Sequence, residues 1–151
     1  MHTRRETLSH SLRVAALLAS TGLFPLLASA ASNRAAFDAK NLAEALKALG
    51  AGAPVESKDV VLTAPDIAEN GAVVPIIVST TLPGVRQILV LVEKNPSALA
   101  AVFTLTDNVE PNLSARIKMA QSSDVYGVVI TTDGRVRYAK KDVKVTLGGC
   151  G

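Results

Sequence analysis

The stretch VYGVVITTDGRVRY, residues 125–138, decides the fold of this chain. Its first part, Val125–Thr131, is apolar and β-branched, and a second short run, Arg135–Tyr138, follows after Asp133-Gly134. Two such runs joined through Asp-Gly predict a β-hairpin, because the favoured tight turns need residues that tolerate a positive φ. The stretch therefore predicts two adjacent antiparallel strands.

The same alternation of short runs and turn residues extends over residues 55–147. The other runs with strand character are residues 60–63, 73–80, 87–92, 101–105, 113–119 and 142–147. About seven short strands, with turns roughly every ten residues and no helical segment between them, predict an immunoglobulin-like antiparallel β-sandwich. A closed barrel is the alternative.

Two details belong to this expected sandwich. Residues 66–71, DIAENG, end in Asn-Gly and predict a turn. In the last run the side chains alternate, so Val143, Val145 and Leu147 share one face of the strand.

Residues 31–54 differ from the rest of the chain and predict a helix with a linker. The apolar residues that recur at helical spacing are Ala35, Ala39, Leu42, Leu46 and Leu49, and Gly50 ends the pattern. We expect one amphipathic helix and then a Gly/Ala/Pro linker over residues 50–54. The mixed charge of its polar face favours packing against the core or a partner over binding to a membrane surface.

Residues 1–30 have the parts of a secretory signal peptide. A basic head contains Arg4-Arg5, an apolar run extends from Val14 to Leu27, and small residues lead up to Ala30. The arginine pair favours the twin-arginine variant over an ordinary secretory signal, so we expect a periplasmic protein. The apolar run contains Ser, Thr, Gly and Pro and is shorter than the roughly 20 residues of a membrane span, so no membrane anchor is expected.

Removal of this segment changes the composition. The full chain has 16 Lys+Arg and 13 Asp+Glu, and loss of three arginines and one glutamate lowers the net charge from +3 to +1. This near-neutral charge does not favour a nucleic-acid partner. Both histidines, His2 and His10, also lie in the segment. Histidine-dependent catalytic dyads and the usual imidazole-based zinc and copper sites are therefore not expected, and no cofactor is predicted in this chain.

The only cysteine, Cys150, lies in the C-terminal sequence GGCG, residues 148–151. It cannot form a disulfide within the chain, and a single thiol offers a metal only one ligand. Gly148, Gly149 and Gly151 have no side chains to pack, so we expect a flexible arm that extends roughly 13 Å beyond the last strand. Nothing near the thiol in the sequence activates it. The pattern predicts a substrate carrier with Cys150 as covalent attachment site, and not an enzyme.

Other interpretations of the terminal thiol stay open. In the first, Cys150 is an inert cysteine in the tail, although an exposed thiol in an exported protein is prone to oxidation. In another, the chain is an exported immunoglobulin-like interaction module that forms disulfide-linked dimers through Cys150; an enzyme is a weaker third. Lys140, Lys141 and Lys144 are the nearest cations and could attract an anionic group on the sulfur, but a solvated strand edge is the plainer interpretation.

Four stretches carry a resemblance that covers essentially the whole chain after residue 30. They are residues 66–75 (DIAENGAVVP), 95–96 (NP), 116–120 (RIKMA) and 143–151 (VKVTLGGCG). Together with a twin-arginine-like signal and a single cysteine, they resemble SoxY, the Y-subunit family of the sulfur-oxidation (Sox) thiosulfate carrier. The family typically ends in Gly-Gly-Cys-Gly-Gly, one glycine longer than this sequence.

The resemblance implies a heterodimer with the smaller Sox Z subunit, which has a related β-sandwich. It implies that a c-type cytochrome, the haem-bearing partner, joins thiosulfate oxidatively to the cysteine matching Cys150. A thiosulfohydrolase would then remove the terminal sulfonate as sulfate, and a sulfane dehydrogenase, where present, would oxidise the remaining sulfur. Gly148, Gly149 and Gly151 would supply the slim swinging arm.

Overall fold

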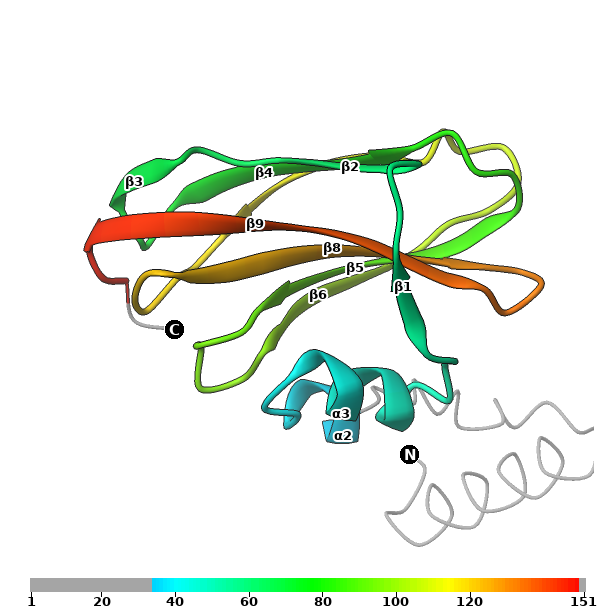
Figure 1. The fold of residues 1–151 in the computed structure, drawn as a ribbon, viewed down its shortest axis with the longest axis horizontal. Helices are drawn as coiled ribbons and strands as arrows, with labels where there is room; N and C mark the ends of the chain where they lie inside the picture. Colours follow the sequence, from blue (N-terminus) through cyan, green and yellow to red (C-terminus); the bar gives the residue numbers. More distant parts are fainter. Residues whose placement is uncertain (1–33, 150–151) are drawn as a thin grey trace, which may run out of the picture. The chain divides into compact units, whose positions relative to one another are not determined.

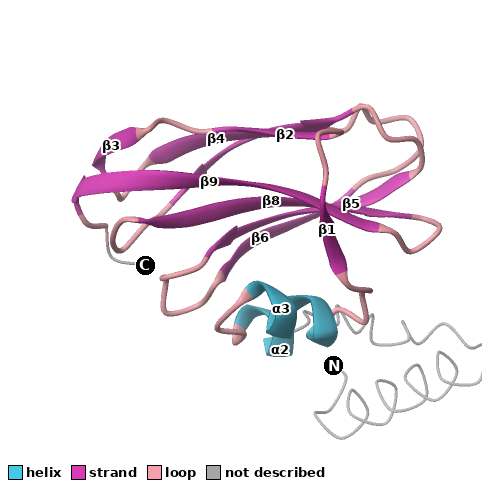
Figure 2. Ribbon diagram, in the orientation of Figure 1, coloured by secondary structure: helices cyan, strands magenta, loops and turns pink. Residues whose placement is uncertain are grey.

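The computed structural model describes residues 34–149. The predicted signal peptide, residues 1–30, and the arm residues Cys150 and Gly151 lie outside the described residues. Within this range, two short helices precede nine strands (Figure 1, Figure 2). They are α2 (Arg34–Phe37), α3 (Leu42–Ala48), β1 (Pro54–Glu56), β2 (Val60–Thr63), β3 (Ile67–Asn70), β4 (Val74–Thr80), β5 (Val85–Val92), β6 (Leu99–Thr104), β7 (Asn112–Ile117), β8 (Ser123–Thr131) and β9 (Val136–Leu147).

The strands form two sheets that face each other (Figure 1). The smaller sheet has the order β2-β4-β7 and is antiparallel. The larger has the order β1-β9-β8-β5-β6, and β3 also pairs with β9. Two separate sheets confirm the predicted immunoglobulin-like sandwich, and the closed barrel is wrong for the described residues.

The larger sheet is buried on both faces. Toward the smaller sheet it contributes Ile88, Val90 and Val92 of β5 and Val129 of β8 to one core. Toward the helices, Leu89, Leu91, Val128 and Ile130 form a second core with residues that include Ala36, Ala45 and Leu46. Burial on both faces explains why β5 and β8 are continuously apolar, whereas a strand with one wet face alternates.

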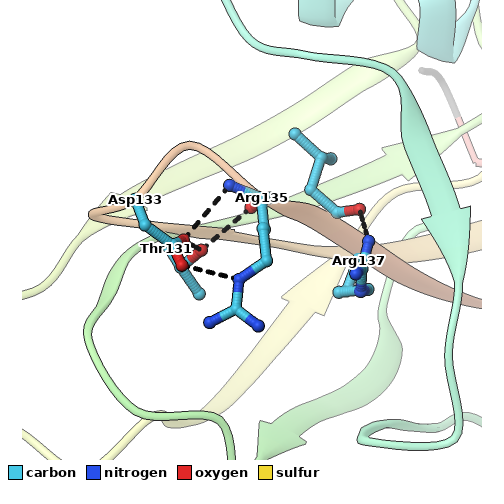
Figure 3. Close-up of polar contacts among 5 residues, drawn as sticks. Thr131, Asp133, Arg135 and Arg137 are labelled. Atoms are coloured by element: carbon cyan, nitrogen blue, oxygen red, sulfur yellow. Dashed lines mark hydrogen bonds and ion pairs between the residues drawn. The ribbon is translucent and has the colours of Figure 1, made fainter.

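The predicted hairpin is confirmed. β8 and β9 pair antiparallel up to Ile130 and Val136, and the turn between them is closed by a hydrogen bond from Thr131 N–H to Arg135 O (3.0 Å). Figure 3 shows the side chains of this turn: Thr131 Oγ1 donates to the Asp133 carboxylate, and Arg135 Nε donates to Asp133 Oδ2 at 2.7 Å. Gly134 has φ +83°, a conformation that an L side chain rarely adopts.

The single predicted helix is wrong, because the segment forms α2 and α3 with a break between them. Asn41 has an extended backbone and its Oδ1 accepts from Glu44 N–H (2.9 Å), while the Glu44 carboxylate accepts from Lys40 N–H. Asn41 Nδ2 also donates to Glu44 Oε1 (2.9 Å), and this pair of side chains, related to a capping box, starts a new helix at Leu42. The break also lets Ala39 O accept from Ala98 N–H (3.0 Å), which ties the helical segment to the residue just before β6.

Three features of the strands differ from the prediction. The runs at residues 135–138 and 142–147 belong to one strand, β9. Residues 67–70, which were expected within a turn, form β3. Residues 54–56 form β1, although the expected linker included Pro54. Both short strands pair with β9 in parallel, so the sandwich is not wholly antiparallel. Short parallel strands leave little local pattern, because their partner lies far away in the sequence.

Candidate functional site

The candidate site is the end of β9, which leads directly to the arm. β8 pairs with β9 as far as Val143, and beyond that residue other groups form the hydrogen bonds to β9. On one side β3 pairs in parallel, with Asn70 opposite Leu147. On the other, the Ser122 hydroxyl accepts from Val145 N–H (2.9 Å). The strand is therefore held from both sides almost to the start of the arm.

Three backbone hydrogen bonds then join two loops to the end of β9 and to the arm, and one of them involves an arm residue. Gly71 N–H donates to Leu147 O (2.7 Å), Met119 N–H donates to Gly71 O (2.7 Å), and Gly149 N–H donates to Met119 O (2.9 Å). The two loops, residues 70–72 and 118–120, form what we call the cradle, which contacts residues 147–149. Met119 is fully buried, so the cradle is anchored in the core between the sheets.

Glycines in the cradle and in the arm allow the segments to approach each other closely. A Cβ on Gly71 would lie 2.3 Å from Met119 O and 2.7 Å from Gly149 N. A Cβ on Gly148 would lie 2.3 Å from Ala120 O, and one on Gly149 would lie 2.5 Å from Ala72 N. None of these three glycines has a positive φ. They are needed for space, not for an unusual backbone conformation.

Two asparagines hold the loops of the cradle. Asn95 Nδ2 donates to Lys118 O (2.8 Å) and its Oδ1 accepts from Ala120 N–H (2.9 Å), so one side chain fixes the peptide groups on both sides of Met119. Asn70 Oδ1 accepts from Ala72 N–H (2.9 Å) and fixes the other loop. Neither asparagine was singled out as a site residue from the sequence, although both lie in stretches that carry the family resemblance.

The predicted arm residues are only partly described. Gly148 is exposed and Gly149 is half-buried, and both lie against the cradle loops. We expected these glycines to leave the fold because they cannot pack through side chains; they contact it through their backbone instead. The outer arm residues, Cys150 and Gly151, lie outside the described residues.

The three lysines nearest the arm in sequence do not form a cluster for an anion. Lys140 pairs with Asp124 (3.4 Å), and the hydrogen bond to that carboxylate raises the pKa of Lys140. Lys141 pairs with Asp66 (2.9 Å) and donates to Ala64 O. For Lys144, no described residue forms an ion pair with the ammonium group. Two of the three ammonium groups are thus engaged in ion pairs. β9 is not an edge strand, because β8 pairs with it on one side and β1 and β3 pair with it on the other, so the edge interpretation is wrong for β9 as a whole.

Metal sites and membrane spans were searched over residues 34–149. In that range no group of three or more His, Cys, Asp or Glu side chains could hold a metal ion. No helix in the same range is long and apolar enough to cross a membrane.

The family model "Sulfur oxidation protein SoxY" matches residues 45–150, and its last matched residue is Cys150. The chain belongs to the SoxY family. The solved structure of the sulfur carrier protein SoxY from Chlorobium limicola f thiosulfatophilum is 34% identical, covers 68% of this chain and 92% of its own, and has a TM-score of 0.60. The sequence-based identification of SoxY is confirmed, and with it the prediction of a carrier and not an enzyme.

More distant structures share the SoxY fold. A superoxide reductase (neelaredoxin) from Ignicoccus hospitalis is 18% identical, covers 57% of this chain and 79% of its own, and has a TM-score of 0.51. At this identity the likeness is one of fold alone. A comparison with curated protein sequences finds no match.

Proposed function

We propose that this SoxY protein is a periplasmic carrier that holds thiosulfate-derived sulfur covalently on Cys150 during thiosulfate oxidation. The observation that carries the proposal is the family match that ends on Cys150, the only cysteine of the chain. The structure supports it through β9 and the cradle, which fix the backbone up to Gly149, one peptide bond before the thiol. The solved relative is itself a sulfur carrier protein.

The loading step is an oxidation. The Cys150 sulfur forms a bond to the sulfane sulfur of thiosulfate, giving a thiosulfonate; the thiol proton goes to water and two electrons leave. An oxidised c-type cytochrome partner would accept these two electrons. Hydrolysis of the thiosulfonate by a partner thiosulfohydrolase then releases sulfate and leaves a sulfane sulfur on Cys150. A sulfane dehydrogenase, where present, would oxidise that sulfur.

We also propose that a Sox Z subunit pairs with this chain. The outer face of the smaller sheet supports a partner, because Val61 on β2 and Ile77 on β4 are about half exposed there (52% and 41%). Val61 and Ile77 are diagonal neighbours across the β2–β4 pair, and contiguous exposed apolar surface marks a site that another protein covers. For export, residues 1–30 supply the expected twin-arginine signal.

Intact mass spectrometry tests the carrier. The mature chain, with its Z subunit, is incubated with thiosulfate and the oxidised cytochrome partner, and the matched control is Cys150→Ser. We expect one thiosulfonate adduct on the wild-type chain and none on the control. Disulfide-linked dimers without any adduct would instead support the interaction module that dimerises through Cys150.

A further inference from the structure

The cradle holds the described part of the arm through backbone contacts. Gly149 is held to Met119 by one backbone hydrogen bond (2.9 Å), and neither Gly148 nor Gly149 has a side chain that adds apolar contact. The net contribution of one backbone hydrogen bond changes an equilibrium constant by about 2- to 13-fold. The contact is therefore specific in geometry but weak enough to open on its own.

Opening the contact changes how far the thiol can move. While Gly149 is docked, the chain is held up to that residue. Release from Leu147 onward adds two residues, or roughly 7 Å of reach at about 3.5 Å per residue. A carrier that visits several partner enzymes needs the longer reach. A docked arm instead keeps Gly149, the residue before Cys150, in one place.

The cradle is built to receive this segment. Gly71 leaves the space that the Gly149 backbone fills, since a Cβ there would lie 2.7 Å from Gly149 N. The Asn95 side chain forms hydrogen bonds to the peptide groups on both sides of Met119 and so orients Met119 O toward Gly149 N–H. These groups come from three separate parts of the chain, and none of them is on the arm itself.

We propose that the arm of this carrier alternates between a docked and a released state, and that Gly71 and Asn95 are the positioning residues that set the balance. The proposal rests on the carrier function proposed above. It assigns the arm glycines a second role: besides making the arm slim, they let its backbone dock where any side chain would collide.

Amide hydrogen exchange by NMR on the reduced mature chain tests docking without any cargo. We expect Gly149 N–H to exchange about 2- to 13-fold more slowly than in an unstructured peptide. Gly148 N–H, for which the described residues provide no acceptor, gives the unprotected reference. In Gly71→Ala the protection of Gly149 should disappear while amides of β5 and β8 stay protected, and a nitroxide attached to Cys150 should become more mobile.

Two further variants separate positioning from folding. Asn95→Ala should reduce Gly149 protection without touching the arm, and Asn95→Asp, which keeps the acceptor for Ala120 N–H, should have an intermediate effect. Gly52→Ala is the matched control, because its Cβ would make only an ordinary contact 3.6 Å from Gly134 O. It should leave Gly149 protection unchanged.

The outcomes distinguish this proposal from the carrier function. Exchange of wild-type Gly149 at the unstructured rate overturns docking, even when Cys150 takes up thiosulfate. Unchanged protection in both Gly71→Ala and Asn95→Ala, with β5 and β8 intact, overturns the assignment of these residues. Protection without any adduct on Cys150 removes the role in carrying, because then no cargo is positioned.

Discussion

The two ends of β9 are closed in different ways. At the start of the strand, Thr131, Asp133 and Arg135 close a turn within five consecutive residues, largely through side chains. At its end, the cradle loops, residues 70–72 and 118–120, contact residues 147–149 through backbone hydrogen bonds. These ends lie at opposite sides of the sandwich (Figure 1). A local turn holds a strand in register, whereas a closure assembled from distant loops can release the chain without disturbing the register.

The largest effect is expected from Met119→Ala, which empties the centre of the cradle. Met119 is fully buried, and truncation of such a side chain to Ala costs about 2–5 kcal/mol. Chemical denaturation should show this loss of stability, and Gly149 N–H should lose its protection at the same time.

Met119→Leu provides the matched control for this cavity. A swap that roughly conserves volume costs less than about 1.5 kcal/mol, so it should keep both stability and Gly149 protection. Retention of full protection in Met119→Ala, with the fold intact, would show that the arm docks independently of the core.

A smaller effect is expected from Gly134→Ala in the opposite closure. The substitution meets no neighbouring atom within 4 Å but places an L side chain at φ +83°. The expected cost is about 1–2 kcal/mol, measured by chemical denaturation. Because the turn and the cradle are separate, Gly149 protection should stay at the wild-type value. Loss of that protection would mean that the two ends of β9 are coupled through the strand.

The contrast between the two closures also explains what the sequence could predict. Asp133-Gly134 lies between two apolar runs, so the hairpin was predictable from local chemistry. Residues 67–70 were interpreted as part of a turn, since Asn70-Gly71 is a local turn signal. Their partner is β9, more than seventy residues away, and no periodicity in four residues reveals a parallel partner at that distance.

The arm glycines show a second limit of the same kind. The pair Gly148-Gly149 predicted a flexible arm, because the backbone of glycine has few conformational constraints. Their contacts depend on Gly71, on the position of Met119 O, and on Asn95, which the sequence places far from the arm. The helix break was predictable from local sequence, because Asn41 and Glu44 form a capping pattern. The spacing of the apolar residues alone did not reveal this break.

The smallest effect concerns pH, and it should affect only one of the two closures. The hydrogen bond from Thr131, with further hydrogen bonds from Arg135, lowers the pKa of Asp133 below that of an ordinary aspartate. A carboxylate whose pKa is lower in the folded state stabilises the fold above its unfolded pKa, and this contribution is lost as the pH falls through the folded value. Because Asp133 is exposed, the effect on stability should be slight.

NMR titration of the Asp133 carboxyl carbon measures this shift. Thr131→Val, which removes the hydroxyl at a buried position while keeping the shape of the side chain, should raise the pKa of Asp133 toward the ordinary range. Thr104→Val, on the edge strand β6, is the control and should leave it unchanged. The cradle is assembled from backbone and asparagine amide groups, which do not titrate in this range. The protection of Gly149, relative to the unstructured rate at each pH, should therefore stay constant while Asp133 titrates, and a parallel change in both would show that protonation of the turn reaches the arm.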